Sequence, residues 1–113
     1  MELILPIPPS VNELYLPNKR GGQRKSEKYK DWIERAHKFY LVVKRSTVPV
    51  RGKYTFVMKV PATMRGDVDN RAKAALDFLA NMKLTDDDRH CVSSTVKRDA
   101  YLTAIAIVEV TAA

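Results

Sequence analysis

One segment near the middle of the chain has the spacing of a β-strand and lies between two segments with the spacing of α-helices. In residues 54–60, large apolar side chains occupy every second position: Tyr54, Phe56, Met58 and Val60. Such alternation is typical of a strand with one buried face. In residues 27–44 and 71–82, apolar side chains recur every three to four residues, as on one face of a helix. A strand between two helices favours a sheet with helices packed against it.

Three further segments have the composition of strands. Residues 3–7 are apolar and are followed by Pro8 and Pro9, which end a strand because proline donates no hydrogen bond to a sheet ladder. Residues 90–97 and 101–110 follow the second helix, and we expect them to pair as a hairpin. The order is therefore βαβαββ. It predicts a single α/β domain over residues 1–113, with about four strands in a mixed sheet and helices packed against it.

Local signals predict where the helices begin and where the chain turns. Ser26 is a favourable N-cap for the first helix, and Asp69 or Asn70 can cap the second. Residues 10–25 are predicted to be a loop, because they contain several turn-forming residues: Pro17, Asn18, Gly21 and Gly22. This loop is long for a passive connection.

The chain is basic, and the charge is unevenly placed. Its 113 residues include 20 Lys and Arg against 13 Asp and Glu, for a net charge of +7. Between Pro17 and Lys53 there are 12 basic and 3 acidic residues. Such a block can bind phosphates and release their counterions. A solvated helix face on a basic surface explains the same block equally well, so charge alone leaves both interpretations open.

Composition excludes several classes of function. The single cysteine forms no intrachain disulfide, and the two histidines are too far apart in sequence to form a local metal pair. No apolar run approaches the roughly 20 residues that a membrane span needs. The N-terminus does not resemble a signal peptide. We therefore expect a cytoplasmic protein with no membrane partner.

Two groups of aspartates are the side chains best suited to chemistry. Asp67 and Asp69 alternate just before the second helix, so both carboxylates can project to one side of an extended segment. The aspartates of residues 86–88 form a turn that can return beside them. Carboxylates, waters and a phosphate oxygen together supply the octahedral oxygen shell that Mg²⁺ prefers. Alternatively, the first pair only caps a helix and the second group is a solvated turn.

Lys73 lies four residues after Asp69, one helical turn above the acids. It could meet a substrate phosphate there. Alternatively it pairs with Asp77, four residues further on, in a surface ion pair that contributes about 0.3 to 0.5 kcal/mol. Both interpretations stay open.

Several of these patterns, in order along the chain, resemble the RusA-type Holliday-junction resolvases of bacteria and their phages. Residues 5–15, Leu-Pro-Ile-Pro-Pro-Ser-Val-Asn-Glu-Leu-Tyr, are similar to that family's Pro-x-Pro-Pro-Ser-x-Asn-x-x-Tyr opening. Residues 67–73, Asp-Val-Asp-Asn-Arg-Ala-Lys, resemble its Asp-x-Asp-Asn-x-x-Lys signature, and an Asp-Asp turn follows at a similar spacing. The resemblance covers nearly the whole chain and implies a RusA-like fold.

The resemblance implies a magnesium-dependent endodeoxyribonuclease, with Mn²⁺ as a possible substitute, that resolves four-way DNA junctions in recombination and repair. Asp67, Asp69 and Asp88 would be catalytic and would bind the metal, with Asp87 next to Asp88 as the alternative third carboxylate. Lys73 matches the family's essential lysine and would be the fourth catalytic residue. It would stabilise charge on the transition state or on the leaving oxygen, and the sequence does not decide between these roles.

The resemblance also implies a homodimer acting on branched DNA, because junction resolution needs two symmetrical nicks. The candidate DNA-binding residues are Lys19, Arg20, Arg24, Lys25, Arg65 and Asn70. Two other functions stay open. One is a less selective nuclease that acts on branched replication intermediates. The other is a non-catalytic, basic DNA-binding protein whose acids are only structural.

Overall fold

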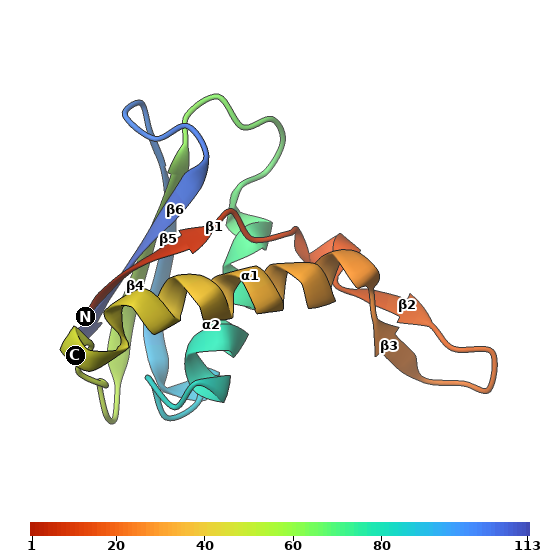
Figure 1. The fold of residues 1–113 in the computed structure, drawn as a ribbon, viewed down its shortest axis with the longest axis horizontal. Coiled ribbons are helices and arrows are strands. Elements are labelled where there is room, and N and C mark those ends of the chain that lie inside the picture. The colour runs from red at the N-terminus through yellow and green to blue at the C-terminus, as the bar shows by residue number, and fades with distance from the viewer.

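The computed structural model describes residues 1–113, which form a four-stranded mixed sheet, a separate two-stranded sheet and two α-helices (Figure 1). The strands are β1 (Glu2–Pro6), β2 (Tyr15–Pro17), β3 (Gln23–Lys25), β4 (Tyr54–Pro61), β5 (Cys91–Asp99) and β6 (Ile105–Ala112). The helices are α1 (Glu27–Val43) and α2 (Ala72–Asn81), together with the short 3₁₀ helices η1 (Val11–Glu13), η2 (Lys44–Ser46), η3 (Asp69–Arg71) and η4 (Asp88–His90). The predicted α/β fold class is confirmed.

The larger sheet has the order β1-β6-β4-β5, so β4 and β6 are its central strands. Tyr54, Phe56 and Met58 of β4 are fully buried, as their alternation predicts. In the antiparallel register of the two central strands, Met58 lies opposite Val108 and Phe56 lies opposite Val110. The two strands therefore supply one continuous apolar face, which needs a covering layer.

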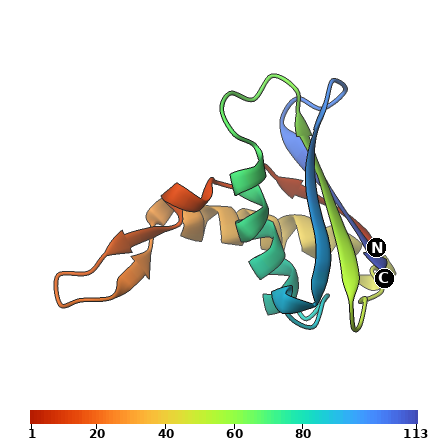
Figure 2. The same ribbon diagram turned by 180° about the vertical axis from the view of Figure 1, so that it is seen from behind.

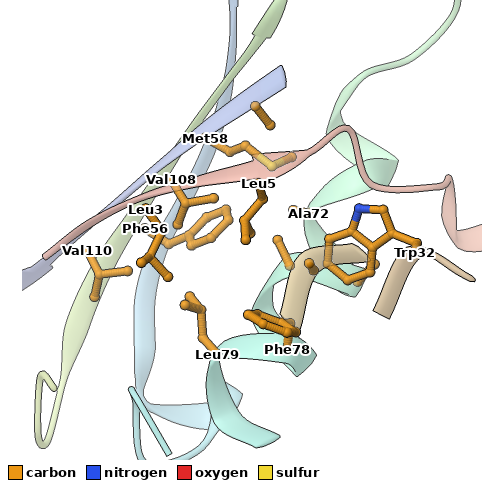
Figure 3. Close-up of a cluster of buried hydrophobic side chains, with 14 of the residues drawn as sticks. Leu3, Leu5, Trp32, Phe56, Met58, Ala72, Phe78, Leu79, Val108 and Val110 are labelled. Atoms are coloured by element: carbon orange, nitrogen blue, oxygen red, sulfur yellow. The ribbon is translucent and has the colours of Figure 1, made fainter. Parts of the chain in front are cut away.

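Both α-helices cover this one face of the sheet (Figure 2). Trp32 of α1 meets Phe78 of α2 edge to face, with ring centroids 5.8 Å apart (Figure 3). The indole Nε1 of Trp32 donates a hydrogen bond of 2.9 Å to the carbonyl oxygen of Pro6, at the end of β1. One buried side chain thus joins both helices to the sheet. Neither helix has the length and apolar character that crossing a membrane requires.

The last two strands do not form the predicted hairpin. β5 runs parallel to β4 at one edge of the sheet, and β6 lies on the other side of β4, between β4 and β1. Residues 100–104 therefore carry the chain across the end of β4. Burial explains the arrangement: β6 buries Ala106, Val108 and Val110, whereas β5 has exposed polar residues, such as Ser93 and Ser94, that suit an edge.

Residues 10–25 are not the predicted loop, because they contain η1 and a hairpin formed by β2 and β3. The two strands pair antiparallel, with Tyr15 opposite Lys25. At the turn, the backbone nitrogen of Asn18 donates to the carbonyl of Gly22, and Gly22 adopts a φ of +73° that favours glycine. The hairpin projects away from the body of the molecule (Figure 1). Its strands escaped prediction because all their residues are exposed, so no apolar alternation marks them.

Candidate active site

The segment that leads into α2 presents two acidic side chains. The residue at the N-cap of α2 is Arg71, and no side chain caps the helix, so the prediction that Asp69 or Asn70 caps it is wrong. Instead, Oδ1 of Asp67 accepts a hydrogen bond of 3.0 Å from the backbone nitrogen of Asp69. This bond closes a local turn that leads the chain into η3. The Asp69 carboxylate makes no hydrogen bond within the chain, so both of its oxygens are free to bind a ligand.

Lys73, in the first turn of α2, lies between two carboxylates. Its Nζ is 3.0 Å from Oδ1 of Asp77 and 3.3 Å from Oδ2 of Asp88. The surface pair with Asp77 therefore forms, and a second contact to the later aspartate turn forms with it. The hydrogen bond to Asp77 raises the pKa of Lys73 against the opposing effect of burial, and Asp88 raises it further. The ammonium group therefore stays protonated at neutral pH.

The first two of the three consecutive aspartates have structural contacts. Asp86 accepts a hydrogen bond of 2.8 Å from the backbone nitrogen of Gly52 and forms an ion pair with Arg51. These contacts lower its pKa and attach the turn to the segment before β4. Asp87 caps η4 by accepting a hydrogen bond of 3.0 Å from the backbone nitrogen of Arg89, which lowers its pKa.

Only the third of these aspartates reaches α2. Asp88 accepts a hydrogen bond from Lys73 through Oδ2. The sequence leaves Asp87 and Asp88 as alternative site residues, and their contacts in the structure differ. One caps a 3₁₀ helix and the other faces the lysine of the signature.

The chain contains no group of three or more His, Cys, Asp or Glu side chains arranged to hold a metal ion. Asp67, Asp69 and Asp88 are therefore not gathered into one ligand set, and their assignment as metal ligands stays a prediction. Their chemistry nevertheless fits a hard divalent cation, because all the donors are carboxylate oxygens, which Mg²⁺ and Mn²⁺ prefer. The free carboxylate of Asp69 agrees with this fit.

A pocket of about 470 Å³ connects the aspartate turn to the base of the hairpin. Tyr15 and Lys25, which are paired across β2 and β3, line it together with Asp77 and residues 86–88. Tyr29 of α1 also lines the pocket, and its ring packs edge-on against Tyr15 at a centroid distance of 5.9 Å. Burial raises the pKa of Tyr29 to about 12, so its hydroxyl stays protonated and the side chain contributes no charge to the pocket.

Four of the predicted DNA-binding residues lie on the hairpin or its turn: Lys19, Arg20, Arg24 and Lys25. All four are exposed, and none forms an ion pair with any carboxylate of the chain. On α1, by contrast, Lys30 and Lys38 pair with glutamates about one turn away. The hairpin therefore presents positive charge that no partner within the chain neutralises.

The other two predicted DNA-binding residues differ from each other. Arg65 is exposed in the connection between β4 and η3 and forms no ion pair. Asn70 is half-buried, and its Oδ1 atom is buried without a hydrogen-bond partner. Arg65 is thus available to a phosphate, whereas Asn70 points its carbonyl oxygen into the protein. DNA binding by either residue stays a prediction.

Sequence reasoning missed a contact that links the two most distinctive motifs. Nη1 of Arg71 donates a hydrogen bond of 2.8 Å to the carbonyl oxygen of Pro8. This bond attaches the start of α2 to the proline-rich N-terminal segment. No spacing rule could find it, because its partners are 63 residues apart and meet only in the folded chain.

These features define a class of protein. A protonated lysine between carboxylates, two further acids in the segment before the same helix and a hairpin with unpaired cations suit a protein that acts on a phosphate backbone. The family model for endodeoxyribonuclease RusA matches residues 6–111. A comparison with curated proteins gives no match. Because the family model covers almost the whole chain, the chain belongs to the RusA family of Holliday-junction endodeoxyribonucleases.

Family membership confirms the resemblance inferred from residues 5–15 and 67–73. It identifies an enzyme that cleaves phosphodiester bonds in DNA. The family therefore argues against the non-catalytic DNA-binding protein that the charge pattern alone allowed.

Proposed function

We propose that this protein is a magnesium-dependent endonuclease that resolves four-way DNA junctions by paired, symmetrical nicks during recombination and repair. The observation that carries the proposal is the position of Lys73 between Asp77 and Asp88, four residues after Asp69 in the acidic signature. Hydrolysis of a phosphodiester adds negative charge at phosphorus in the transition state. A fixed cation beside metal-binding carboxylates stabilises that charge.

Asp67, Asp69 and Asp88 are the residues that we propose to hold Mg²⁺, with Mn²⁺ as a substitute. When bound, the metal lowers the pKa of a water ligand and neutralises phosphate charge. We favour Asp88 over Asp87 as the third carboxylate, because Asp88 contacts Lys73 of the signature and Asp87 does not. Asp69 contributes a carboxylate that the fold itself does not use.

Lys73 has a geometry that suits the stabilisation of phosphate oxygens. An ammonium group has three hydrogens to donate, and Asp77 and Asp88 accept two of them. Two partners on different elements hold Nζ in place and leave the third hydrogen free. That hydrogen would be donated to a non-bridging oxygen or to the leaving oxygen of the scissile phosphate.

We propose that the hairpin cations and Arg65 bind the DNA backbone, which is the main source of affinity in a complex that recognises shape. Lys25 belongs to this set and also lines the pocket beside the aspartates. A DNA arm bound along the hairpin would therefore lead toward that pocket. Two symmetrical nicks require two active sites related by a two-fold axis, so we propose that the enzyme acts as a homodimer.

The deciding experiment is cleavage of a synthetic four-way junction by Asp69→Asn and by the wild type, with and without Mg²⁺ and with linear duplex as competitor. Asparagine keeps the size of the side chain and removes its charge. We expect cleavage to be abolished while junction binding is preserved or strengthened, because less negative charge faces the DNA. Asp31→Asn, which removes an exposed charge from α1, is the control and should cleave normally.

Unaltered Mg²⁺-dependent cleavage by Asp69→Asn would contradict the assignment of this residue to the metal. Equal cleavage of flaps, forks and four-way junctions would instead identify the less selective nuclease. Paired nicks that depend on both Mg²⁺ and Asp69 are the expected result.

A further inference from the structure

The connection between β4 and η3 leads directly into the acidic signature and has little support from backbone hydrogen bonds. Residues 62–67 are mostly exposed, and none of them belongs to a helix or strand. Within the connection, the backbone nitrogen of Ala62 donates to the carbonyl of Asp99, and that of Met64 donates to the carbonyl of Pro61. Arg65, Gly66 and Asp67 have no backbone–backbone hydrogen bond, so another group must define the path of the chain before Asp67.

That group is the side chain of Arg98 on β5. Its Nη1 donates to the carbonyl oxygens of Ala62, at 3.2 Å, and of Met64. Its Nη2 donates to the carbonyl oxygen of Gly66 at 2.8 Å. Three alternate carbonyls of one connection therefore converge on one guanidinium group. The register of the sheet brings it there, because Arg98 lies opposite Val60 in the parallel pairing of β4 and β5.

The last of these carbonyls belongs to the residue before Asp67. Gly66 has a φ of +81°, a conformation that other residues rarely adopt, so its backbone turns the chain sharply at this point. The bond from Arg98 holds this turn from one side. On the other side, Asp67 accepts the backbone hydrogen bond of Asp69. The direction in which the first carboxylate of the signature leaves the chain thus depends on Arg98.

We propose that Arg98 is a positioning residue for the nuclease site. By binding the carbonyls of Ala62, Met64 and Gly66, it holds Asp67 in the orientation that metal binding requires. This inference rests on the proposed function. Lysine would replace it poorly, because a planar guanidinium reaches separate carbonyls with two nitrogens, whereas an ammonium group has one.

The test compares Arg98→Ala and Arg98→Lys with Lys97→Ala, a control that removes a charge from the adjacent position of β5, where no hydrogen bond or ion pair is lost. We expect Arg98→Ala to lower the single-turnover cleavage rate about 10- to 100-fold and to raise the Mg²⁺ concentration needed for half-maximal cleavage, as the loss of outer support for metal ligands usually does. Junction binding in EDTA should change little. Arg98→Lys should recover part of the rate.

A second measurement does not depend on activity. Trypsin cleaves after Arg65, inside the connection that Arg98 holds. Without the guanidinium, the connection should open more often, and native-state cleavage at Arg65 should be about tenfold faster, as expected for the loss of hydrogen bonds to a charged group. Lys97→Ala should digest at the wild-type rate. Digestion of Arg98→Ala at that rate would overturn the inference.

The two proposals fail in distinguishable ways. If Asp67→Asn still cleaves in a metal-dependent manner, the proposed metal site is wrong, whatever Arg98 does to proteolysis. If Asp67→Asn is inactive and Arg98→Ala cleaves with the wild-type rate and metal dependence, the metal site stands and Arg98 does not position it.

Discussion

The hairpin and α2 both carry basic residues, and the two regions use them differently. Lys73 of α2 is bound to two carboxylates, at 3.0 and 3.3 Å. The cations of the hairpin have no carboxylate partner. A cation with two partners is held at a defined point, which suits the stabilisation of one developing charge. Cations without partners are free to adjust to phosphates along a DNA backbone, which suits affinity without strict geometry.

The two regions also differ in how firmly each is packed against the body of the molecule. α2 is attached to the body by fully buried residues such as Ala74, Ala75 and Leu79. In β2 and β3, by contrast, every residue is exposed. Rigid elements hold reacting groups better than projecting ones. We therefore expect α2 to serve the chemistry and the hairpin to serve DNA binding, and substitutions can test that division.

Of the substitutions that compare the two regions, Lys73→Ala should have the largest effect. Loss of a cation that stabilises transition-state charge should lower the turnover number about 100- to 1,000-fold, with a much smaller change in junction affinity. Lys38→Ala is a matched control, because Lys38 forms a similar ion pair with Glu34, one helical turn away on α1. Single-turnover cleavage and junction titrations check both quantities. A fall in affinity alone would make Lys73 a phosphate anchor and remove the contrast with the hairpin.

The opposite pattern is expected when the four hairpin cations are replaced by glutamine: Lys19, Arg20, Arg24 and Lys25. Each phosphate contact contributes about 0.9 to the slope of log affinity against log salt concentration, so the slope should fall by about 3 to 4. Cleavage at saturating enzyme should be nearly unchanged. The control replaces Lys30 and Lys38, which are already paired with glutamates. An unchanged salt slope would show that the hairpin does not bind the backbone.

The smallest effect concerns the base of the hairpin. The carboxylate of Glu13 accepts hydrogen bonds from Lys28 of α1 and from the backbone and hydroxyl of Ser10. These contacts, led by that of Lys28, lower its pKa from 4.5 to about 2. A lowered pKa in the folded state stabilises the protein above pH 4.5, and this contribution is lost as the pH falls toward 2.

Glu13→Gln should therefore lower the free energy of unfolding by only about 1 kcal/mol at neutral pH, since solvent screens this partly exposed pair. Urea unfolding at several pH values checks the prediction. The difference from the wild type should shrink between pH 4.5 and pH 2. A difference that grows on acidification would show that Glu13 does not act through its charge.

Local patterns in the sequence were sufficient for the helices, for β4 and for the acidic signature. The alternation from Tyr54 to Val60 and the helical spacing around Trp32 reflect which side chains are buried, and burial confirmed both. The contacts of Asp88 and Arg98 were not predictable from spacing. Each joins residues that are distant along the chain, and one of three consecutive aspartates cannot be told from its neighbours before the turn is folded.

The sequence by itself thus determined the types and order of most elements, the basic character of residues 17–53 and the family. Backbone geometry imposes a regular spacing of apolar residues on any strand or helix with one buried face, so short segments of sequence are enough to recognise these elements. Only the tertiary structure decided that β6 lies between β1 and β4, that residues 15–25 form a projecting hairpin and that Asp88 faces Lys73. The strand order depends on which faces of the helices and sheet bury the most apolar area together. The contacts of the polar side chains depend on which groups then lie close to one another. A short segment of sequence carries neither kind of information, because both involve residues that are far apart in the chain.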